Sequence, residues 1–478
     1  MKKNIIATAL LAVLGQTVPA YATNWLELEN NEKPGAKAVN LWGFIQPQFV
    51  VNRGGPVEGI KTPPQLSQYN GQTPLFNLVG PDFSHKDQLQ IFRARPGVRG
   101  VIPGTEEKFN YFVLAELGNN GLTEVWDGRT FKYHPVLTDA TLTYNTSITR
   151  IRAGLGRLPM GEEAMLGEPA MDYVNLTNVS DQLLNERFVT RYYSGREEVP
   201  MLGVPMSQTT NNGTPVGVGC TTPGGHCVGA TLNGSVGAFR DFGLEAYDWF
   251  NRGNWEYSYA LMLSDGNGID YNNNNNYDVT GRLQASYIFG DSGPKRQDAS
   301  VYVWHQGGQR GYMGQDYSRI REGVGAKYLH NNVRVGSEYI RAKGMIYYGV
   351  VAPFNDIGGT SFQPVDQMAL NSSNKADGYY LDLGWMFMPK WEAEMRYDTL
   401  DKLTNSAYDE RKTSTMTYGL QYFYSTAMRF VVDFEVRQQS VANPSAWTTA
   451  AQHTQLTDAS IIAGSVGNRL DVQLTYAF

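Results

Sequence analysis

The sequence contains little of what enzymes and cofactor-binding proteins usually carry. Its 478 residues include six histidines and two cysteines. No histidine lies in an H-E-x-x-H motif or in the spacing of a catalytic triad, and no C-x-x-C-H haem motif is present. Ser235-Val236-Gly237 lacks the pattern of a nucleophile elbow, and Gly217-Val218-Gly219 opens no predicted helix that could hold a phosphate. The sequence therefore predicts neither catalysis nor a bound cofactor or metal ion.

Residues 1–22 have the organisation of a secretory signal peptide. Lys2 and Lys3 precede a short apolar run from Ile5 to Leu14, and Ala20-Tyr21-Ala22 has the small residues of a cleavage site. A membrane anchor is the alternative, but an α-helix needs about 20 apolar residues to span a bilayer. We expect residues 1–22 to be removed and residues 23–478 to form one domain.

No later apolar stretch is long enough for a transmembrane helix, because polar residues interrupt each one within a few positions. Only helices and closed barrels satisfy their backbone hydrogen bonds in lipid, so the exported chain is either a soluble protein or a β-barrel. The composition favours a barrel: 51 residues are glycine, and tyrosine is the commonest of the aromatic residues. A net charge of −6, near −8 without Lys2 and Lys3, argues against nucleic acid as a partner.

The last ten residues show the clearest strand pattern. Apolar side chains alternate with mostly polar ones, and the chain ends on Phe478. The apolar set is Leu470, Val472, Leu474, Tyr476 and Phe478. This pattern predicts a strand with one face towards lipid and one towards water. A terminal strand that ends in phenylalanine also resembles the signal recognised by the barrel assembly machinery of the bacterial outer membrane.

The same alternation recurs in segments of about ten residues along the mature chain. Further apolar stripes begin at Trp255, Tyr379, Trp391, Met416 and Met428. Short connections near residues 146–147, 252–253, 331–332 and 389–390 contrast with long ones over 53–87, 159–237 and 349–376. We therefore predict an all-β fold, a transmembrane antiparallel β-barrel of about 16 strands with 18 possible. The strand assignment is weakest over 186–194 and 447–465.

Several stretches resemble the phosphate-selective porin O and P family of outer-membrane porins. They occur in the family's order and cover most of the mature chain, most densely from residue 41 to 290. The stretches are residues 41–49 (LWGFIQPQF), 92–100 (FRARPGVRG), 111–116, 139–144, 152–163 (RAGLGRLPMGEE), 257–268 and 278–283. The resemblance implies a 16-stranded barrel, often a homotrimer, that passes small solutes and, in some members, anions.

Alternation also assigns the charged side chains to the inside of the barrel. Arginines on the early strands lie opposite apolar stripes, and a charge facing lipid at midplane would cost about 2–4 kcal/mol. The residues expected to line the pore and attract anions are Arg93, Arg95, Arg99, Arg150, Arg152 and Arg282. Acids on late strands, Glu392, Glu394, Asp398, Asp433 and Glu435, are also expected inside, which predicts a charge-separated lumen.

The long segment after residue 159 is expected to fold into the pore as a constriction loop. Its first third carries Glu162, Glu163 and Glu168, which could face the arginines across the pore. Two interpretations remain open: the charges create a field that selects ions, or they form salt bridges that stiffen the wall. The phosphate-binding members of the family rely on basic groups, whereas this chain is net acidic.

Cys220 and Cys227 lie in a segment rich in glycine, threonine and proline. An even pair in an exported chain predicts a local disulfide. A metal site with His226 is the alternative, but it lacks a fourth ligand and a scaffold.

Together these patterns predict an outer-membrane porin, a water-filled channel for passive diffusion of small polar solutes, with a preference for anions such as phosphate. Its expected partners are outer-membrane lipid, the barrel assembly machinery and small solutes, and its expected location is the bacterial outer membrane. The alternatives are a barrel that sheaths a partner protein in an electron-transfer complex and, less favoured, a barrel enzyme. An inward charged loop favours the porin, whereas a wide neutral lumen would favour the sheath.

Overall fold

The computed structural model describes residues 32, 35–60, 70, 87–120, 123–126, 131–185, 239–269, 272, 274–290, 296–312, 315–347, 368–369 and 371–478. The predicted signal peptide and the predicted Cys220–Cys227 disulfide lie outside these residues, so both stay predictions.

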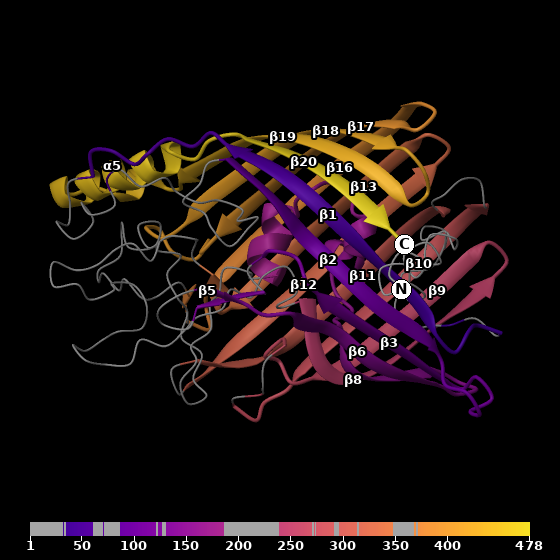
Figure 1. Cartoon of the computed structure of the whole chain (residues 1–478). Helices are drawn as coiled ribbons and strands as arrows, with labels where there is room; N and C mark the ends of the chain where they lie inside the picture. The colour runs from indigo at the N-terminus through magenta and orange to yellow at the C-terminus, as the bar shows by residue number, and fades with distance from the viewer. Residues whose placement is uncertain are drawn as a thin grey trace.

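Sixteen antiparallel strands form one closed barrel, as the sequence predicted (Figure 1). Each strand pairs with the next one around the barrel, and β1 pairs with β20 to close it. The strands are β1 (Asn40–Asn52), β2 (Asp87–Val101), β3 (Phe109–Glu116), β6 (Val136–Asn145), β7 (Arg150–Arg157), β8 (Arg240–Arg252), β9 (Trp255–Ser264), β10 (Asp278–Gly290), β11 (Gln297–Tyr312), β12 (Gln315–His330), β13 (Val333–Gly344), β16 (Lys375–Met388), β17 (Trp391–Lys402), β18 (Arg411–Phe423), β19 (Met428–Val441) and β20 (Arg469–Ala477). Two further sheets of two strands each, β4 (Glu124–Trp126) with β5 (Phe131–Tyr133) and β14 (Ile346–Tyr347) with β15 (Met368–Ala369), are separate from the barrel sheet.

The alternation of apolar and polar residues places one face of each strand on the outside. On β9, Leu261 and Leu263 are more than half exposed, whereas Glu256 and Ser258 between the apolar positions are buried. The closed ladder pairs the backbone groups of neighbouring strands, so no sheet edge remains open. An apolar exterior with a polar interior is the arrangement that a membrane-spanning barrel requires.

Strict alternation along the early strands would place Phe92 and Leu155, opposite the arginines, on the lipid face, but both are buried. The pairing of β1 with β2 shifts between Gln46 and Pro47, which leaves Phe92 as an extra residue on β2. Phe92 is buried, and the guanidinium carbon of Arg93 lies 4.6 Å from the centroid of its ring. Leu155 on β7 is also buried, and it follows Gly154, whose φ of 124° departs from regular strand geometry. Strict alternation therefore fails where the backbone is irregular.

Connections at the two ends of the barrel differ in length, as predicted. Gly253, Asn331 and Lys390 have φ values of 60°, 55° and 70°, which is the left-handed conformation that tight hairpin turns require. The long connection between β19 and β20 contains helix α5 (Ala450–Gly464), which a capping box of Thr449 and Gln452 begins. This helix replaces the weakly assigned strand over 447–465. No helix among the described residues is long and apolar enough to cross a membrane.

The chain terminus closes the barrel seam. The backbone N–H of Phe478 donates to the carbonyl of Gly43 at 2.9 Å, and the N–H of Gly43 donates to the carbonyl of Phe478 at 2.9 Å. The Phe478 ring also fills the space beside Gly43, because a Cβ added at this glycine would lie 2.8 Å from it. The terminal residue therefore contributes both hydrogen bonds and packing to the β1–β20 contact.

We predict that deleting Phe478 lowers the yield of folded barrel, because the seam loses two hydrogen bonds and an aromatic contact. Heat modifiability on gels measures the folded fraction, and a Phe478→Tyr variant, which keeps the ring, is the control. Equal amounts of heat-modifiable protein in the deletion variant and the wild type would contradict this role.

Candidate functional site

The chain enters the barrel interior after β7. Residues 158–185, here called the inward segment, include α3 (Glu162–Met165), a 3-10 turn (Glu168–Ala170) and a π-helical turn (Ser180–Asn185). Met160, Leu183 and Leu184 of this segment are fully buried and belong to one apolar cluster with Ile340 and Leu400 of the wall. Figure 1 shows these magenta turns within the barrel. The predicted inward path of this long connection is therefore confirmed over residues 158–185, and its role as a constriction stays a prediction.

Local chemistry explains where α3 begins. Gly161 precedes it, and a Cβ at this position would lie 3.0 Å from Oε1 of Glu338 on β13. A larger residue would therefore push the Glu338 carboxylate away from the start of the helix. The N–H of Glu162 donates to Oε2 of Glu338 at 3.1 Å. Glu162 and Glu163 occupy the first turn, where carboxylates interact favourably with the helix dipole.

Glu168 of the inward segment binds to a group of arginines on the wall. Its carboxylate lies 2.7 Å from Nη2 of Arg157 and 3.8 Å from Nη2 of Arg240, and it pairs with Nη1 of Arg95. Burial alone would raise the pKa of Glu168, but Arg157, Arg95 and Arg240 outweigh it and hold the pKa well below its ordinary value of 4.5. Arg95 is itself fully buried and also contacts Glu116 at 2.7 Å. Arg95 and Glu168, both predicted from the sequence, thus meet.

The other early-strand arginines also have polar partners. Arg93 and Arg152 are buried, whereas Arg99 and Arg150 are partly exposed. The contacts are Arg93 with Oε1 of Gln46 at 3.0 Å, Arg99 with Glu32, Arg150 with Asp248, and Arg152 Nε with Oε2 of Glu245 at 2.8 Å. The arginines therefore form a ladder of hydrogen bonds and ion pairs along β2 and β7.

Glu162 and Glu163 face the opposite part of the wall. Glu162 contacts Nη2 of Arg282 at 2.8 Å and Nζ of Lys327 at 2.6 Å. Burial raises the pKa of Glu162, but Lys327 and Arg282 outweigh this effect and lower the pKa from 4.5 to about 2. Glu163 accepts hydrogen bonds from Thr177 at 2.5 Å and from Nη1 of Arg396 at 3.2 Å. Each of the three predicted loop acids thus holds the inward segment to basic residues of the wall.

Acids of the late strands hold the remainder of the inward segment. Asp398, Asp433 and Asp471 are buried, and they accept hydrogen bonds from backbone or asparagine N–H groups of the segment. These contacts are Val174 N with Asp433 at 2.7 Å, Asn175 Nδ2 with Asp471 at 2.9 Å, and Asn178 Nδ2 with Asp398 at 2.6 Å. The segment therefore crosses the lumen and is held by arginines of β2, β7 and β8 and by acids of β17, β19 and β20.

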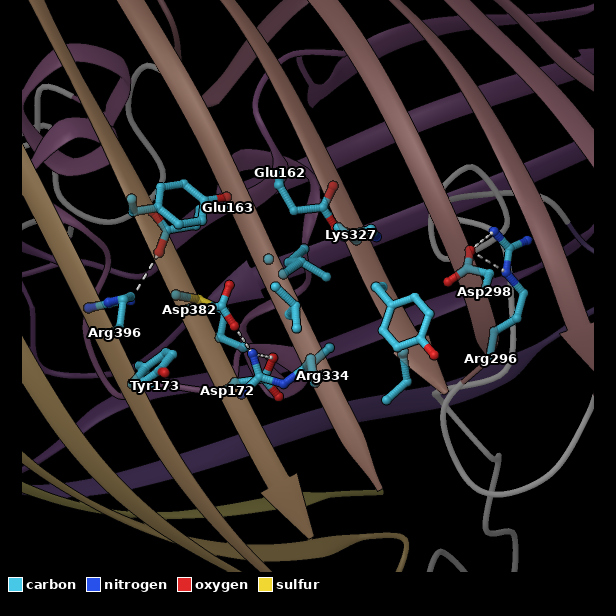
Figure 2. Close-up of a pocket in the computed structure, with 18 of the residues that line it drawn as sticks. Glu162, Glu163, Asp172, Tyr173, Arg296, Asp298, Lys327, Arg334, Asp382 and Arg396 are labelled. Atoms are coloured by element: carbon cyan, nitrogen blue, oxygen red, sulfur yellow. Dashed lines mark hydrogen bonds and ion pairs between the residues drawn. The ribbon is translucent and has the colours of Figure 1, made fainter. Parts of the chain in front are cut away.

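A cavity of about 190 Å³, open to solvent, lies between the inward segment and strands β10–β13, β16 and β17 (Figure 2). Its described lining includes five acids and four basic residues, none of which is an early-strand arginine. These residues are Glu162, Glu163, Asp172, Asp298, Asp382, Arg296, Lys327, Arg334 and Arg396. Tyr173 adds an aromatic face, with the guanidinium carbon of Arg396 4.3 Å from its ring centroid. The cavity wall is thus highly charged and nearly balanced in sign.

The sequence analysis missed the basic side of this cavity. Lys327 lies between the exposed residues Ala326 and Tyr328, and Arg334 follows exposed Val333. The alternation used for the early strands would therefore have assigned both to the interior. Alternation could not predict that Lys327 contacts Glu162 or that Arg334 contacts Asp172. These acids reach the wall only because the inward segment crosses the lumen.

No family model matches the chain, and no curated protein matches it. Solved structures that resemble it include the anion-selective porin from Comamonas acidovorans, with 12% identity over 93% of this chain and 100% of that chain and a TM-score of 0.45. OmpF of Salmonella typhi in complex with daunomycin has 13% identity over 94% and 100% of the two chains and a TM-score of 0.48. The outer-membrane channel DcaP of Acinetobacter baumannii has 11% identity over 94% and 99% and a TM-score of 0.46. The fold assignment rests on the closed barrel of this chain itself.

Proposed function

We propose that this protein is an outer-membrane porin, a channel through which small polar solutes diffuse passively. The observation that carries the proposal is the inward segment, which narrows the barrel and borders an open, charged cavity. An apolar exterior suits lipid, and a polar, charged interior suits water and hydrated solutes. A segment that fills the lumen argues against a sheath, because a partner protein would need that space.

The pairing of charges leads us to propose weak discrimination between anions and cations. Fixed charges select ions when their fields are unopposed, whereas Glu162 and Glu168 lie within ion-pair distance of Arg282 and Arg157. The anion preference suggested by the early arginines, and phosphate as its solute, remain predictions. We further propose residence in the bacterial outer membrane and assembly as a homotrimer, which cross-linking of the purified protein would test.

Planar bilayers and vesicles test the channel proposal directly. Purified protein added to a bilayer should give discrete conductance steps, and reversal potentials in a salt gradient should be small. Proteoliposomes should swell in small sugars and not in large ones. A folded, heat-modifiable protein that inserts and yet gives neither conductance nor swelling would overturn the proposal.

Replacing Arg93 and Arg95 together with alanine should shift the permeability ratio towards cations. Removal of Arg95 leaves Glu116 and Glu168 with fewer opposing charges, so the interior becomes more negative. Reversal potentials in a salt gradient measure the ratio. The control is Arg252→Ala, which removes an exposed charge from the end of β8. An unchanged ratio in the folded double variant would show that these arginines do not influence permeating ions.

A further inference from the structure

One guanidinium on β13 is surrounded by four carboxylates. Arg334 contacts Asp172 at 3.2 Å, Glu392 at 3.2 Å and Glu394 at 2.6 Å, and it also pairs with Asp382 (Figure 2). A guanidinium carries one positive charge, so the ionised group of five retains an excess of negative charge. Charges out of water are costly unless they are paired, and this excess needs compensation.

Two other arginines that contact the inward segment, Arg396 and Arg429, donate their hydrogen bonds elsewhere. Arg396 donates to Oε1 of Glu163 at 3.2 Å and to the carbonyl of Asn175 at 3.0 Å. Arg429 donates to Oε1 of Gln421 at 3.0 Å and to the carbonyl of Met171. These contacts hold the inward segment and a neighbouring amide, and none of them reaches Glu392 or Glu394.

A second, independent observation concerns two buried oxygens next to this group. Among the described residues, Oε2 of Glu394 and Oδ1 of Asp433 have no hydrogen-bond partner. The side chain of Glu394 has no exposed area, and Asp433 is fully buried. Both oxygens point into the space above Gly419 on β18, where an added Cβ would lie 3.0 Å from Glu394 Oε2 and 2.8 Å from Asp433 Oδ1. A buried carboxylate oxygen without a protein partner needs an ion or a water molecule beside it.

We propose that Glu394 and Asp433, together with Asp172 and Glu392, bind a divalent cation, with Ca²⁺ as the best fit. Ligand oxygens of Asp172, Glu392 and Glu394 lie within 4.8 Å of one another. Oxygens that bind Ca²⁺ at 2.3–2.6 Å can be about 5 Å apart across the ion, so the spacing of these three carboxylates is compatible with one ion. Asp433 enters the proposal through its Oδ1, which lies beside Glu394 Oε2 near Gly419. Arg334 contacts Glu394 through Oε1, which leaves Oε2 available to a cation.

The cation would link three parts of the structure. Asp172 belongs to the inward segment, Glu392 and Glu394 to β17, and Asp433 to β19. Asp172 also lines the cavity, which gives the ion a route from solvent. Bound Ca²⁺ would therefore fasten the inward segment to strands β17 and β19.

Calorimetric titration of the full chain in detergent, with CaCl₂ alone after EDTA treatment and dialysis, tests the site. It does not rest on the proposed function, because binding is measured without a membrane or a current. Extracellular-type sites have Kd values of about 10⁻⁴–10⁻³ M, which sets the concentration range. We expect one saturable site in the wild type, its loss in the double variant Glu394→Gln and Asp433→Asn, and its retention in the control Asp401→Asn and Glu410→Gln.

The control removes the same number of carboxylates from positions outside this cluster, where Asp401 and Glu410 pair with Lys412. Heat modifiability confirms that each variant is folded. If the first double variant does not fold, Asp172→Asn replaces it, with at least a tenfold weaker site expected. Absence of saturable binding in the wild type, or equal binding in the folded test variant, would overturn the proposal.

Discussion

Replacing residues 162–184 with a short Gly/Ser linker is expected to raise the single-channel conductance about two- to threefold, because barrels of 16 strands leave an aqueous channel when no loop fills them. The removed residues are buried inside the barrel almost throughout and include the charged groups on one side of the cavity. Their removal should also change the reversal potential, because Glu162, Glu163 and Glu168 leave with them. Planar-bilayer recordings on folded protein measure both quantities.

A matched replacement in another connection distinguishes a wider pore from a general loss of barrel stability. Helix α5 lies in the connection between β19 and β20 and packs against β19 rather than crossing the lumen. Replacement of residues 450–464 by the same linker should leave the conductance near the wild-type value. Unchanged conductance after removal of the inward segment would mean that other parts of the chain set the width of the pore.

The Glu168→Gln substitution is expected to destabilise the folded barrel by about 3–5 kcal/mol, because removing one partner of a buried ion pair leaves the other charges uncompensated. Arg95, Arg157 and Arg240 all lose their shared carboxylate, and each of these arginines is almost fully buried. Denaturant unfolding of protein in detergent micelles, followed by intrinsic fluorescence, measures the loss. The inward segment should also become more susceptible to protease.

The exposed pair of Glu106 and Lys108 provides a matched control. Glu106→Gln removes a carboxylate from a salt bridge of 2.6 Å whose side chains are more than half exposed. Solvent-exposed ion pairs contribute little to stability, so this variant should unfold at the wild-type denaturant concentration. Equal midpoints for Glu168→Gln, Glu106→Gln and the wild type would show that the Glu168 cluster contributes nothing net to stability.

The same acids give the fold a defined dependence on pH. Glu162 has a folded pKa of about 2 against an ordinary value of 4.5, and the folded pKa of Glu168 also lies well below 4.5. A carboxyl group with a depressed folded pKa stabilises the folded state above its unfolded pKa, and this contribution is lost as the pH falls towards the folded pKa. Stability should therefore decline from about pH 4.5 towards pH 2, and less steeply in Glu168→Gln.

The sequence by itself determined the barrel and the identity of its two faces. Strand side chains point alternately to opposite sides, so a stripe such as Leu470 to Tyr476 specifies a lipid face without any tertiary information. Arg95 could be assigned to the interior for the same reason. The assignment failed at Phe92, because an extra residue in β2 interrupts the alternation, and local sequence does not mark that position.

Only the tertiary structure decided which charges meet. Glu168 is 73 residues from Arg95 and 72 from Arg240, yet the path of the inward segment brings all three together. Asp172 and Arg334 are farther apart in sequence and also in contact. Alternation specifies only whether a side chain points inward. Barrel curvature and the route of a connecting segment across the lumen determine its partner, and ion-pair strength depends on that distance and on burial.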